Sequence, residues 1–187
     1  AQVGHRLDKE TSGVLIFAKH PAAYRHISMQ FEHRQVTKIY HAVADGRHDF
    51  QDQLVDAPIL KQNDGTARIS SKGKDAQTRF TTQKIFSNHS LIECRPVTGR
   101  MHQIRVHLSA RGLPLVGDKL YGPDDAMFAR GADGALTDED RAALELDRHA
   151  LHAARLELDH PIRGGRVRIE APLAADLQAF CDRLAPA

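Results

Sequence analysis

The sequence contains little cysteine, no long apolar run and no leader segment, and each absence narrows what the protein can be. Its 187 residues include two cysteines, Cys94 and Cys181, and no Cys-x-x-Cys pair, which excludes a disulfide-rich framework. The longest unbroken apolar run extends from Val14 to Ala18, far short of the ~20 residues that a membrane-spanning helix needs. Because no basic and apolar leader opens the chain, we expect a protein of the reducing cytoplasm that is not inserted in a membrane.

The motifs that mark nucleotide cofactors, hydrolytic serines and zinc are also missing. The sequence has no Gly-x-x-x-x-Gly-Lys-Ser/Thr loop, Gly-x-Gly-x-x-Gly turn, Gly-x-Ser-x-Gly elbow or His-Glu-x-x-His pair. The 12 histidines leave a metal-dependent hydrolase open, since His149 and His152 are three residues apart and could converge. His102 and His107, five residues apart, would lie on different faces of a helix. We expect no metal and no other cofactor.

Charge gives the first positive signal, because it is distributed unevenly along a chain whose net charge is only +2. Residues 1–120 contain 18 Lys and Arg against 11 Asp and Glu, whereas residues 121–187 contain 8 against 13. A basic two-thirds joined to an acidic remainder favours a polyanionic partner on one face. Chance scatter of charge is the alternative.

The residue pattern predicts one α+β domain over residues 1–187, with a mixed, mostly antiparallel sheet and flanking helices. Alternating or β-branched apolar residues predict the strands, and apolar positions three and four apart predict the helices. The expected strands are Gly13–Lys19, Thr37–Ala44, Thr66–Ser70, Gln77–Phe86, Ser90–Val97, Ala150–Leu158 and Arg166–Glu170. The expected helices are Pro21–Arg34, His102–Arg111, Thr137–Asp147 and Leu173–Leu184. Residues 122–134, rich in Gly, Asp and Ala, predict a surface loop within an insertion at about 122–148.

Polar residues gather before the first apolar strand, in the segment His5–Gly13. There Asp8 lies between cations, and small hydroxyl residues and a glycine follow it. A loop beside a rigid strand is where catalytic groups are usually placed, and an aspartate there can be a nucleophile, a base or a metal ligand. A capping aspartate in a turn is the more common structural explanation.

Two further segments carry candidate residues. The segment Thr98–His107 would place unpaired backbone N–H groups and basic side chains together at a helix start, which suits a phosphate, or an ion pair between Arg105 and a buried carboxylate. A basic, solvated helix face is the alternative. In the strand that contains Lys38, the ring of Tyr40 is either ordinary sheet packing or an aromatic platform for a base.

Taken together, these segments resemble the RluA-type pseudouridine synthases. The resemblance covers nearly the whole chain, and five motifs in order carry it. They are HRLDKETSG (His5–Gly13), KIYHAVADG (Lys38–Gly46), GKDAQT (Gly73–Thr78), TGRMHQIRVHLSARGLPLVGDKLYG (Thr98–Gly122) and LHAARLELDHP (Leu151–Pro161). The resemblance implies a mostly antiparallel sheet with a central catalytic cleft. It also implies conversion of a uridine in RNA to pseudouridine without cofactor or metal, with ribosomal RNA favoured over transfer RNA.

The resemblance also implies roles for particular residues. Asp8 would be the catalytic aspartate, and Arg105 the cation that keeps it ionised and aims it. Tyr40 would lie against the target uracil and help to remove its C5 proton. Arg6 would face the RNA and fill the stack that the extruded base leaves. The expected RNA-binding residues are Arg6, Lys38, Arg100, His102 and Gln103.

The sequence departs from the family pattern at three places. Met101 stands where the family usually has Thr or Ser, so the following helix is expected to lack a side-chain cap, at about 1 kcal/mol. Leu113 replaces the usual His. The family's upstream strands, with a Lys-Pro-x-Gly segment, are not in the sequence, which also starts without Met, so we expect a truncated domain. An RNA-binding fragment without catalysis is therefore the alternative function, and a monomer is the expected state.

Overall fold

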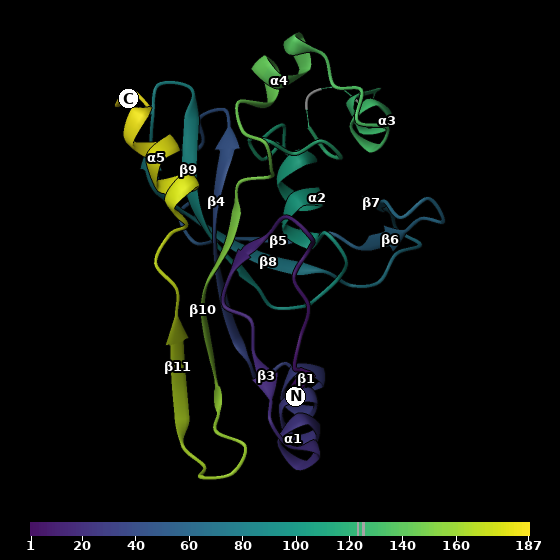
Figure 1. Cartoon of the computed structure of the whole chain (residues 1–187), viewed down its shortest axis with the longest axis vertical. Coiled ribbons are helices and arrows are strands. Elements are labelled where there is room, and N and C mark those ends of the chain that lie inside the picture. The colour runs from purple at the N-terminus through teal and green to yellow at the C-terminus, as the bar shows by residue number, and fades with distance from the viewer. Residues whose placement is uncertain (123, 125) are drawn as a thin grey trace.

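The computed structural model describes residues 1–122, 124 and 126–187, and within them the main feature is a seven-stranded sheet (Figure 1). Its strand order is β11-β10-β4-β9-β8-β5, with β2 added beside β10. All of its pairings are antiparallel except β2 with β10. The strands are β2 (Ser12–Gly13), β4 (Thr37–Asp45), β5 (Gln53–Asp56), β8 (Gln77–Ile85), β9 (His89–Pro96), β10 (Leu151–Asp159) and β11 (Arg166–Glu170). The α+β, mostly antiparallel prediction is therefore confirmed.

Smaller elements surround this sheet. Two short antiparallel pairs join β1 (Gln2–Val3) to β3 (Phe17–Ala18) and β6 (Ile59–Lys61) to β7 (Ala67–Ile69). The helices are α1 (Pro21–Glu32), α2 (Gln103–Ser109), α3 (Ala126–Ala132), α4 (Asp138–Leu144) and α5 (Ala175–Arg183). In Figure 1, α1 lies beside β1 and β3 at one end, and α2, α3 and α4 gather at the other. No helix in the described part of the chain is long and apolar enough to span a bilayer.

The helix starts follow local chemistry. Proline at the first position of α1 fits because Pro21 has no N–H to leave unpaired and its φ is already helical. Thr137 caps α4 as predicted, since its side chain accepts from the backbone N–H of Asp140 while the Asp140 carboxylate accepts from that of Thr137. By contrast, α2 has no side-chain cap, as expected, but its N-cap residue is His102 and not Met101.

Three local predictions were wrong. Residues 13–19 do not form one buried strand, because Gly13 leaves the extended region with φ +114° and Leu15 and Phe17 point to solvent. The expected loop at 122–134 contains α3, although residues 123 and 125 lie outside the described part. Residues 49–65, where no strand was predicted from the sequence, contain β5 and β6.

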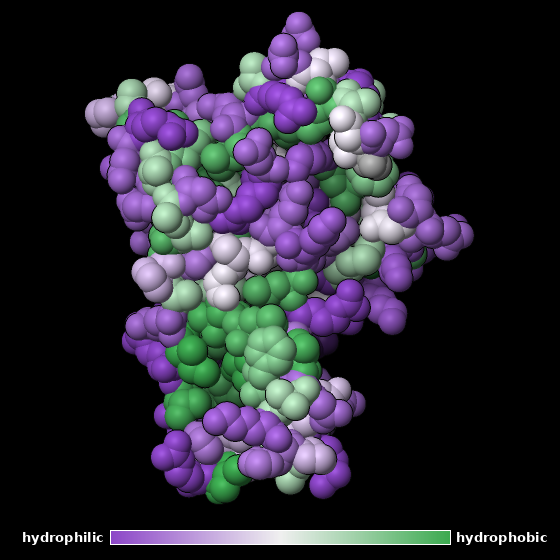
Figure 2. Space-filling view, viewed as in Figure 1, coloured by the Kyte–Doolittle hydropathy of each residue, from purple (hydrophilic) through white to green (hydrophobic). Residues whose placement is uncertain are grey.

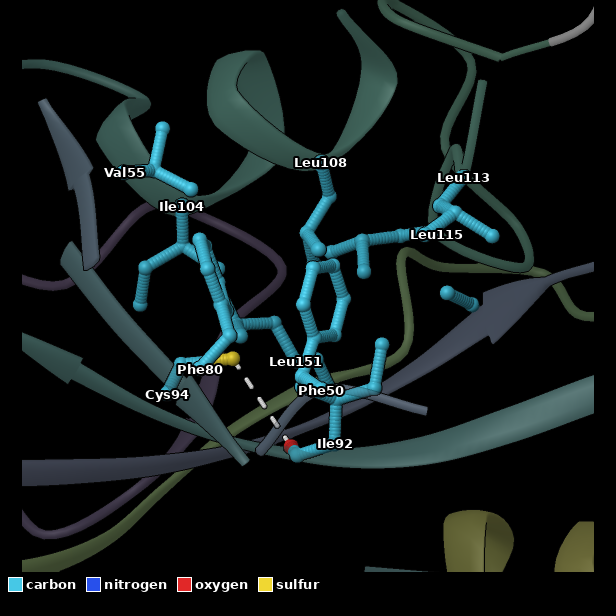
Figure 3. Packing of buried hydrophobic residues seen from close by; sticks show 12 residues of the cluster. Phe50, Val55, Phe80, Ile92, Cys94, Ile104, Leu108, Leu113, Leu115 and Leu151 are labelled. Atoms are coloured by element: carbon cyan, nitrogen blue, oxygen red, sulfur yellow. Dashed lines mark hydrogen bonds between the residues drawn. The ribbon is translucent and has the colours of Figure 1, made fainter. Parts of the chain in front are cut away.

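The largest core cluster packs α2 against the sheet (Figure 3). Ile104 and Leu108 of α2 meet Phe50 and Phe80, whose ring centroids are 5.3 Å apart. Leu113, which replaces the family's histidine, is buried at the edge of this cluster. The packing fixes α2 on the sheet and so fixes the residues at its N-terminal end.

A second apolar cluster is open on one side. Val14, Ile27 and Leu156 pack between α1 and the far end of β10. Figure 2 shows hydrophobic residues gathered on the surface over β3, β10 and β11. Phe17 and Ile169, on β3 and β11, are among the exposed large apolar residues. This surface lies at the opposite end of the sheet from α3 and α4.

Candidate active site

The loop that carries Asp8 is fixed by the parallel pairing of β2 with β10. This segment, purple in Figure 1, rises from β1 toward the level of α2 and returns to β3. Gly13 ends the loop at φ +114°, and a Cβ there would lie 2.1 Å from the backbone oxygen of Ala153. Only glycine allows the loop to approach β10 so closely. The backbone N–H of Thr11 donates to the carbonyl of Asp8 at 2.9 Å, which closes a turn around the aspartate.

Two buried histidines, one on β10 and one just before it, hold the same loop through its side chains. His149 Nε2 lies 2.8 Å from Thr11 Oγ1, and His152 Nδ1 lies 2.9 Å from Ser12 Oγ. Burial, followed by the charge of Arg105, lowers the pKa of His149 to about 4, so its ring is neutral at pH 7. These contacts give both histidines a structural role. Among the described residues no group of three or more His, Cys, Asp or Glu could hold a metal ion.

Arg105 joins Asp8 to a second carboxylate that the sequence did not single out. One of its terminal nitrogens donates to Asp8 Oδ2 at 3.0 Å, and its Nε and other terminal nitrogen donate to Asp118 at 2.8 and 2.9 Å. The Asp118 side chain is fully buried, whereas 27% of the Asp8 side chain is exposed, toward the cleft. The predicted pair of Arg105 with a carboxylate is therefore present, and Asp118 anchors the arginine from behind.

The ionisation of this group is set by its own contacts. Burial opposes the charge of Asp118, but the hydrogen bonds and charge of Arg105 outweigh it and lower its pKa. Burial likewise opposes the charge of Arg105, yet Asp118 and then Asp8 raise its pKa above the usual value. Backbone N–H groups of Leu120 and Tyr121 each donate to Asp118 Oδ1 at 3.0 Å. The result is a fixed cation with one carboxylate in the core and one at the cleft.

A cleft of about 320 Å³ lies in front of Asp8, and Tyr40 and Lys38 of β4 form one of its walls. Burial, followed by the charge of Asp8, raises the pKa of Tyr40 to about 12, so its hydroxyl is protonated at neutral pH. Lys38 Nζ donates to the carbonyl of Thr98 at 3.0 Å. Burial, followed by the charge of Arg34, lowers the pKa of Lys38 to about 8.

All eight residues predicted for the site line this cleft. They are Arg6, Asp8, Lys38, Tyr40, Arg100, His102, Gln103 and Arg105. Arg6 is exposed at the rim, and Arg100 Nε donates to the carbonyl of Asp75 at 2.8 Å. Gln103 is buried, and its amide oxygen accepts from the Thr98 hydroxyl and the Arg100 backbone N–H at 2.7 and 3.0 Å. Its position indicates that it shapes the Thr98–Arg100 turn.

A second, broader cleft of about 800 Å³ adjoins the first, and Asp8, His102 and Arg105 are among the residues that line both. Its lining is rich in cations, with the exposed Lys9 and Lys61 joining residues of the first cleft, Arg6 and Arg100. Lys119 also lines it, but its Nζ donates to Glu10 Oε1 at 2.8 Å. The two clefts together form one positively charged surface around Asp8.

This fold and site match one family of known proteins. The family model for RNA pseudouridylate synthase matches residues 1–110, which is more than half of the chain. The chain therefore belongs to the RNA pseudouridylate synthase family.

Individual relatives agree with this assignment. The chain is 38% identical over 175 residues to ribosomal large subunit pseudouridine synthase C of Vibrio cholerae, a match that covers 93% of this chain and 52% of the relative. The protein of the same name from Escherichia coli K12 is 39% identical over 184 residues, with 96% and 55% covered. Human RNA pseudouridylate synthase domain containing 4 aligns with a TM-score of 0.77 at 26% identity, over all of this chain and 77% of that one. The chain spans about half the length of the curated relatives that it matches.

Proposed function

We propose that this chain isomerises uridine in RNA to pseudouridine, with Asp8 as the catalytic aspartate. The observation that carries the proposal is the carboxylate of Asp8, held by Arg105 at 3.0 Å in a cleft that Tyr40 also lines. Family membership supports the reaction, and relatives named for the ribosomal large subunit favour its RNA as the substrate. Such a substrate would place the protein in the cytoplasm.

The reaction exchanges one bond to the ribose for another. The bond between C1′ and N1 of uracil breaks, the base turns, and a bond forms between C1′ and C5. The C5 hydrogen leaves as a proton and N1 gains one, so no oxidant or other co-reactant is consumed. Asp8 would supply the anionic oxygen that acts on the target nucleotide, and Arg105 would keep that oxygen aimed into the cleft.

Tyr40 fits the second half of this reaction. Its ring lines the cleft with Asp8 and can lie against the uracil. Because its pKa is about 12, its hydroxyl can accept the C5 proton only if it passes its own proton on at the same time. Tyr40 would therefore relay the proton between the base and a second acceptor.

The cationic rim suits an RNA whose target nucleotide leaves the helical stack. A stacked nucleotide hides its glycosidic carbon, so the base must be extruded into the smaller cleft before Asp8 can reach it. Arg6 and Arg100 border both clefts and would hold the flanking phosphates. Arg6, exposed at the rim, is the side chain placed to fill the vacated stack.

Release of tritium from RNA labelled at uridine C5 tests the proposal. Ribosomal and transfer RNA made without modification would be incubated separately with the wild type and with Asp8→Asn. We expect release from ribosomal RNA by the wild type and none by Asp8→Asn, while RNA binding by the variant survives. Equal release by both proteins would exclude Asp8 as the catalytic group. Salt-sensitive binding without release by either would instead indicate an RNA-binding module.

A further inference from the structure

His102 lines both clefts, and only one of its ring nitrogens has a partner within the described residues. Nδ1 lies 2.7 Å from the hydroxyl oxygen of Tyr121, and the two rings meet edge to face with centroids 5.5 Å apart. The backbone of His102 is left-handed, with φ +55°, which costs a non-glycine residue on the order of 1 kcal/mol. The fold thus maintains a strained residue in the lining that the two clefts share.

Hydrogen bonding around Tyr121 determines which nitrogen of His102 carries the proton. The backbone N–H of Ala67 donates to the Tyr121 hydroxyl oxygen at 2.9 Å. The hydroxyl proton of Tyr121 then needs an acceptor, and among the described residues only His102 Nδ1 lies within reach. If Nδ1 carried the proton instead, it would donate to the Tyr121 oxygen, and the hydroxyl proton of Tyr121 would have no acceptor among the described residues. This hydrogen-bond network favours the tautomer of neutral His102 that carries its ring hydrogen on Nε2.

The surroundings also favour a neutral ring. Burial lowers the pKa of His102, and the positive charge of Arg105 lowers it further, while Asp8 and Asp118 act in the opposite direction. The Arg105 guanidinium lies 5.0 Å from the centroid of the Tyr121 ring, so a second cation at His102 would lie close to it. His102 therefore provides a donor that carries no charge.

We propose that His102 is a fixed hydrogen-bond donor for the target nucleotide, held by Tyr121 as the Nε2–H tautomer. The nucleotide ligand rests on the proposed function, whereas the tautomer rests only on the geometry of the free protein. The acceptor is an oxygen of that nucleotide, either a uracil carbonyl or a backbone phosphate oxygen. A neutral N–H aimed at a uracil carbonyl would stabilise the negative charge that the base gains when its glycosidic bond breaks.

Nitrogen-15 NMR of histidine-labelled protein tests the tautomer directly. The His102 signals are assigned by their loss in His102→Asn. We expect the pattern of a neutral ring protonated at Nε2 in the wild type and a mixture of tautomers in Tyr121→Phe. Tyr24→Phe, a change on α1 outside the clefts, is the matched control and should leave the pattern unchanged. A ring protonated at Nδ1 in the wild type would overturn the proposal.

Adding RNA tests the donor without depending on turnover. A uridine-containing oligonucleotide is titrated into labelled Asp8→Asn, which keeps the RNA unreacted. We expect the Nε2 and attached proton signals of His102 to move as the complex forms. If they stay in place at saturation, His102 does not contact the nucleotide and the proposal fails, whatever the outcome of tritium release.

Kinetics of two variants identify the acceptor. Asparagine tolerates the left-handed backbone and can still accept from Tyr121, but it does not reach the position of Nε2. Glutamine brings an N–H donor to about that position. We expect His102→Asn to lose about 10- to 100-fold in kcat/KM and His102→Gln to recover part of the loss.

Whether kcat or KM changes in His102→Asn distinguishes a uracil carbonyl from a phosphate oxygen as the acceptor. A fall in kcat at constant KM indicates a uracil carbonyl, and a rise in KM at constant kcat indicates a phosphate. If the wild type turns over RNA and His102→Asn has the same kcat and KM, His102 is not a donor to the nucleotide. The proposed function would still stand.

Discussion

Arg105 is shared by two carboxylates that differ in what they can do. Asp8 is partly exposed to the cleft and free to act on a ligand, whereas Asp118 is buried and holds the guanidinium through two hydrogen bonds. Because a guanidinium is planar, the bidentate contact with Asp118 fixes the direction of the third bond, which goes to Asp8. Asp118 is therefore a positioning residue for the aspartate that we propose to be catalytic.

Replacing Asp118 with asparagine should reduce turnover more than RNA binding. The amide would keep an oxygen for the N–H groups of Leu120 and Tyr121, but its NH2 would face the donors of Arg105. We expect kcat to fall about 100-fold with KM nearly unchanged, and the free energy of unfolding to fall by about 3 kcal/mol. Tritium release and urea unfolding measure the two effects.

The surface pair of Asp52 with Arg79 provides the control for that change. Its charges are mostly exposed, so Asp52→Asn should alter the free energy of unfolding by less than about 0.5 kcal/mol and leave kcat as it was. Normal kcat in Asp118→Asn would show that Asp8 does not need an arginine held from behind.

The sequence predicted the residues that face the cleft better than those that support them. Asp8, Tyr40 and Arg105 belong to recognisable motifs, and all three line the same cleft. Asp118 also lies within a motif, but its role depends on how the turn after α2 folds back against Arg105, which no residue spacing reveals. The role of His149 depends on a contact across 138 residues of chain, and such contacts follow from strand order.

At the scale of elements, one of the three shortest strands positions the site. β2 has two residues, and its pairing with β10 holds the Asp8 loop beside Arg105. The long alternating strands, β8 and β9 among them, could be predicted because each carries its own periodic signal. β2 and β3 carry too few residues for any period, and they exist because β10 and β1 lie beside them. Local pattern therefore identifies the scaffold but not the segment that it positions.

Gly13→Ala should detach the loop that carries Asp8 from β10. The new Cβ would lie 2.1 Å from the oxygen of Ala153 on a backbone with φ +114°, so it adds a clash to the conformational strain. We expect the free energy of unfolding to fall by about 3 kcal/mol and turnover to be lost, measured by urea unfolding and tritium release.

Gly65→Ala separates the cost of a positive φ from the cost of the clash with Ala153. Its φ is also positive, at +85°, but a Cβ there would meet nothing within 4 Å. Gly65→Ala should therefore cost only the strain, about 1 kcal/mol, and keep turnover. Equal losses in the two variants would mean that close approach to β10 does not matter.

On the scale of the whole molecule, seven of the 18 basic residues in the first 120 positions line the two clefts where RNA is proposed to bind. Lys9 and Lys61 come from different segments, yet both line the broader cleft. Each phosphate contact that Lys61→Ala removes should reduce the slope of log binding constant against log salt by about 0.7 to 0.9. The kcat at saturating RNA should not change.

Filter binding over a range of salt concentrations measures that slope. Arg163→Ala, at the turn between β10 and β11, is the control, because Arg163 lines neither cleft. The control should keep the wild-type slope. A wild-type slope in Lys61→Ala would place the RNA outside the broader cleft.

Stability should depend on pH through the histidines that fold in the neutral form. Burial lowers the pKa of His149 from 6.5 to about 4, and it also lowers the pKa values of His5, His41 and His107. Below pH 6.5 the unfolded chain gains protons at these residues before the folded chain does, so the free energy of unfolding falls as pH decreases toward 4. Above pH 6.5 both states are neutral there and this contribution is constant.

His149 alone should account for roughly 2 kcal/mol of stability lost between pH 6.5 and 5. Urea unfolding at a series of pH values measures the loss, and His149→Gln should flatten the curve in this window. Thr11→Val is the matched control, because it removes the hydrogen bond to His149 but keeps the titrating ring. It should lower stability at every pH and keep the slope. If His149→Gln keeps the wild-type slope, other groups cause the acid sensitivity, and His149 does not link protonation to the loop that carries Asp8.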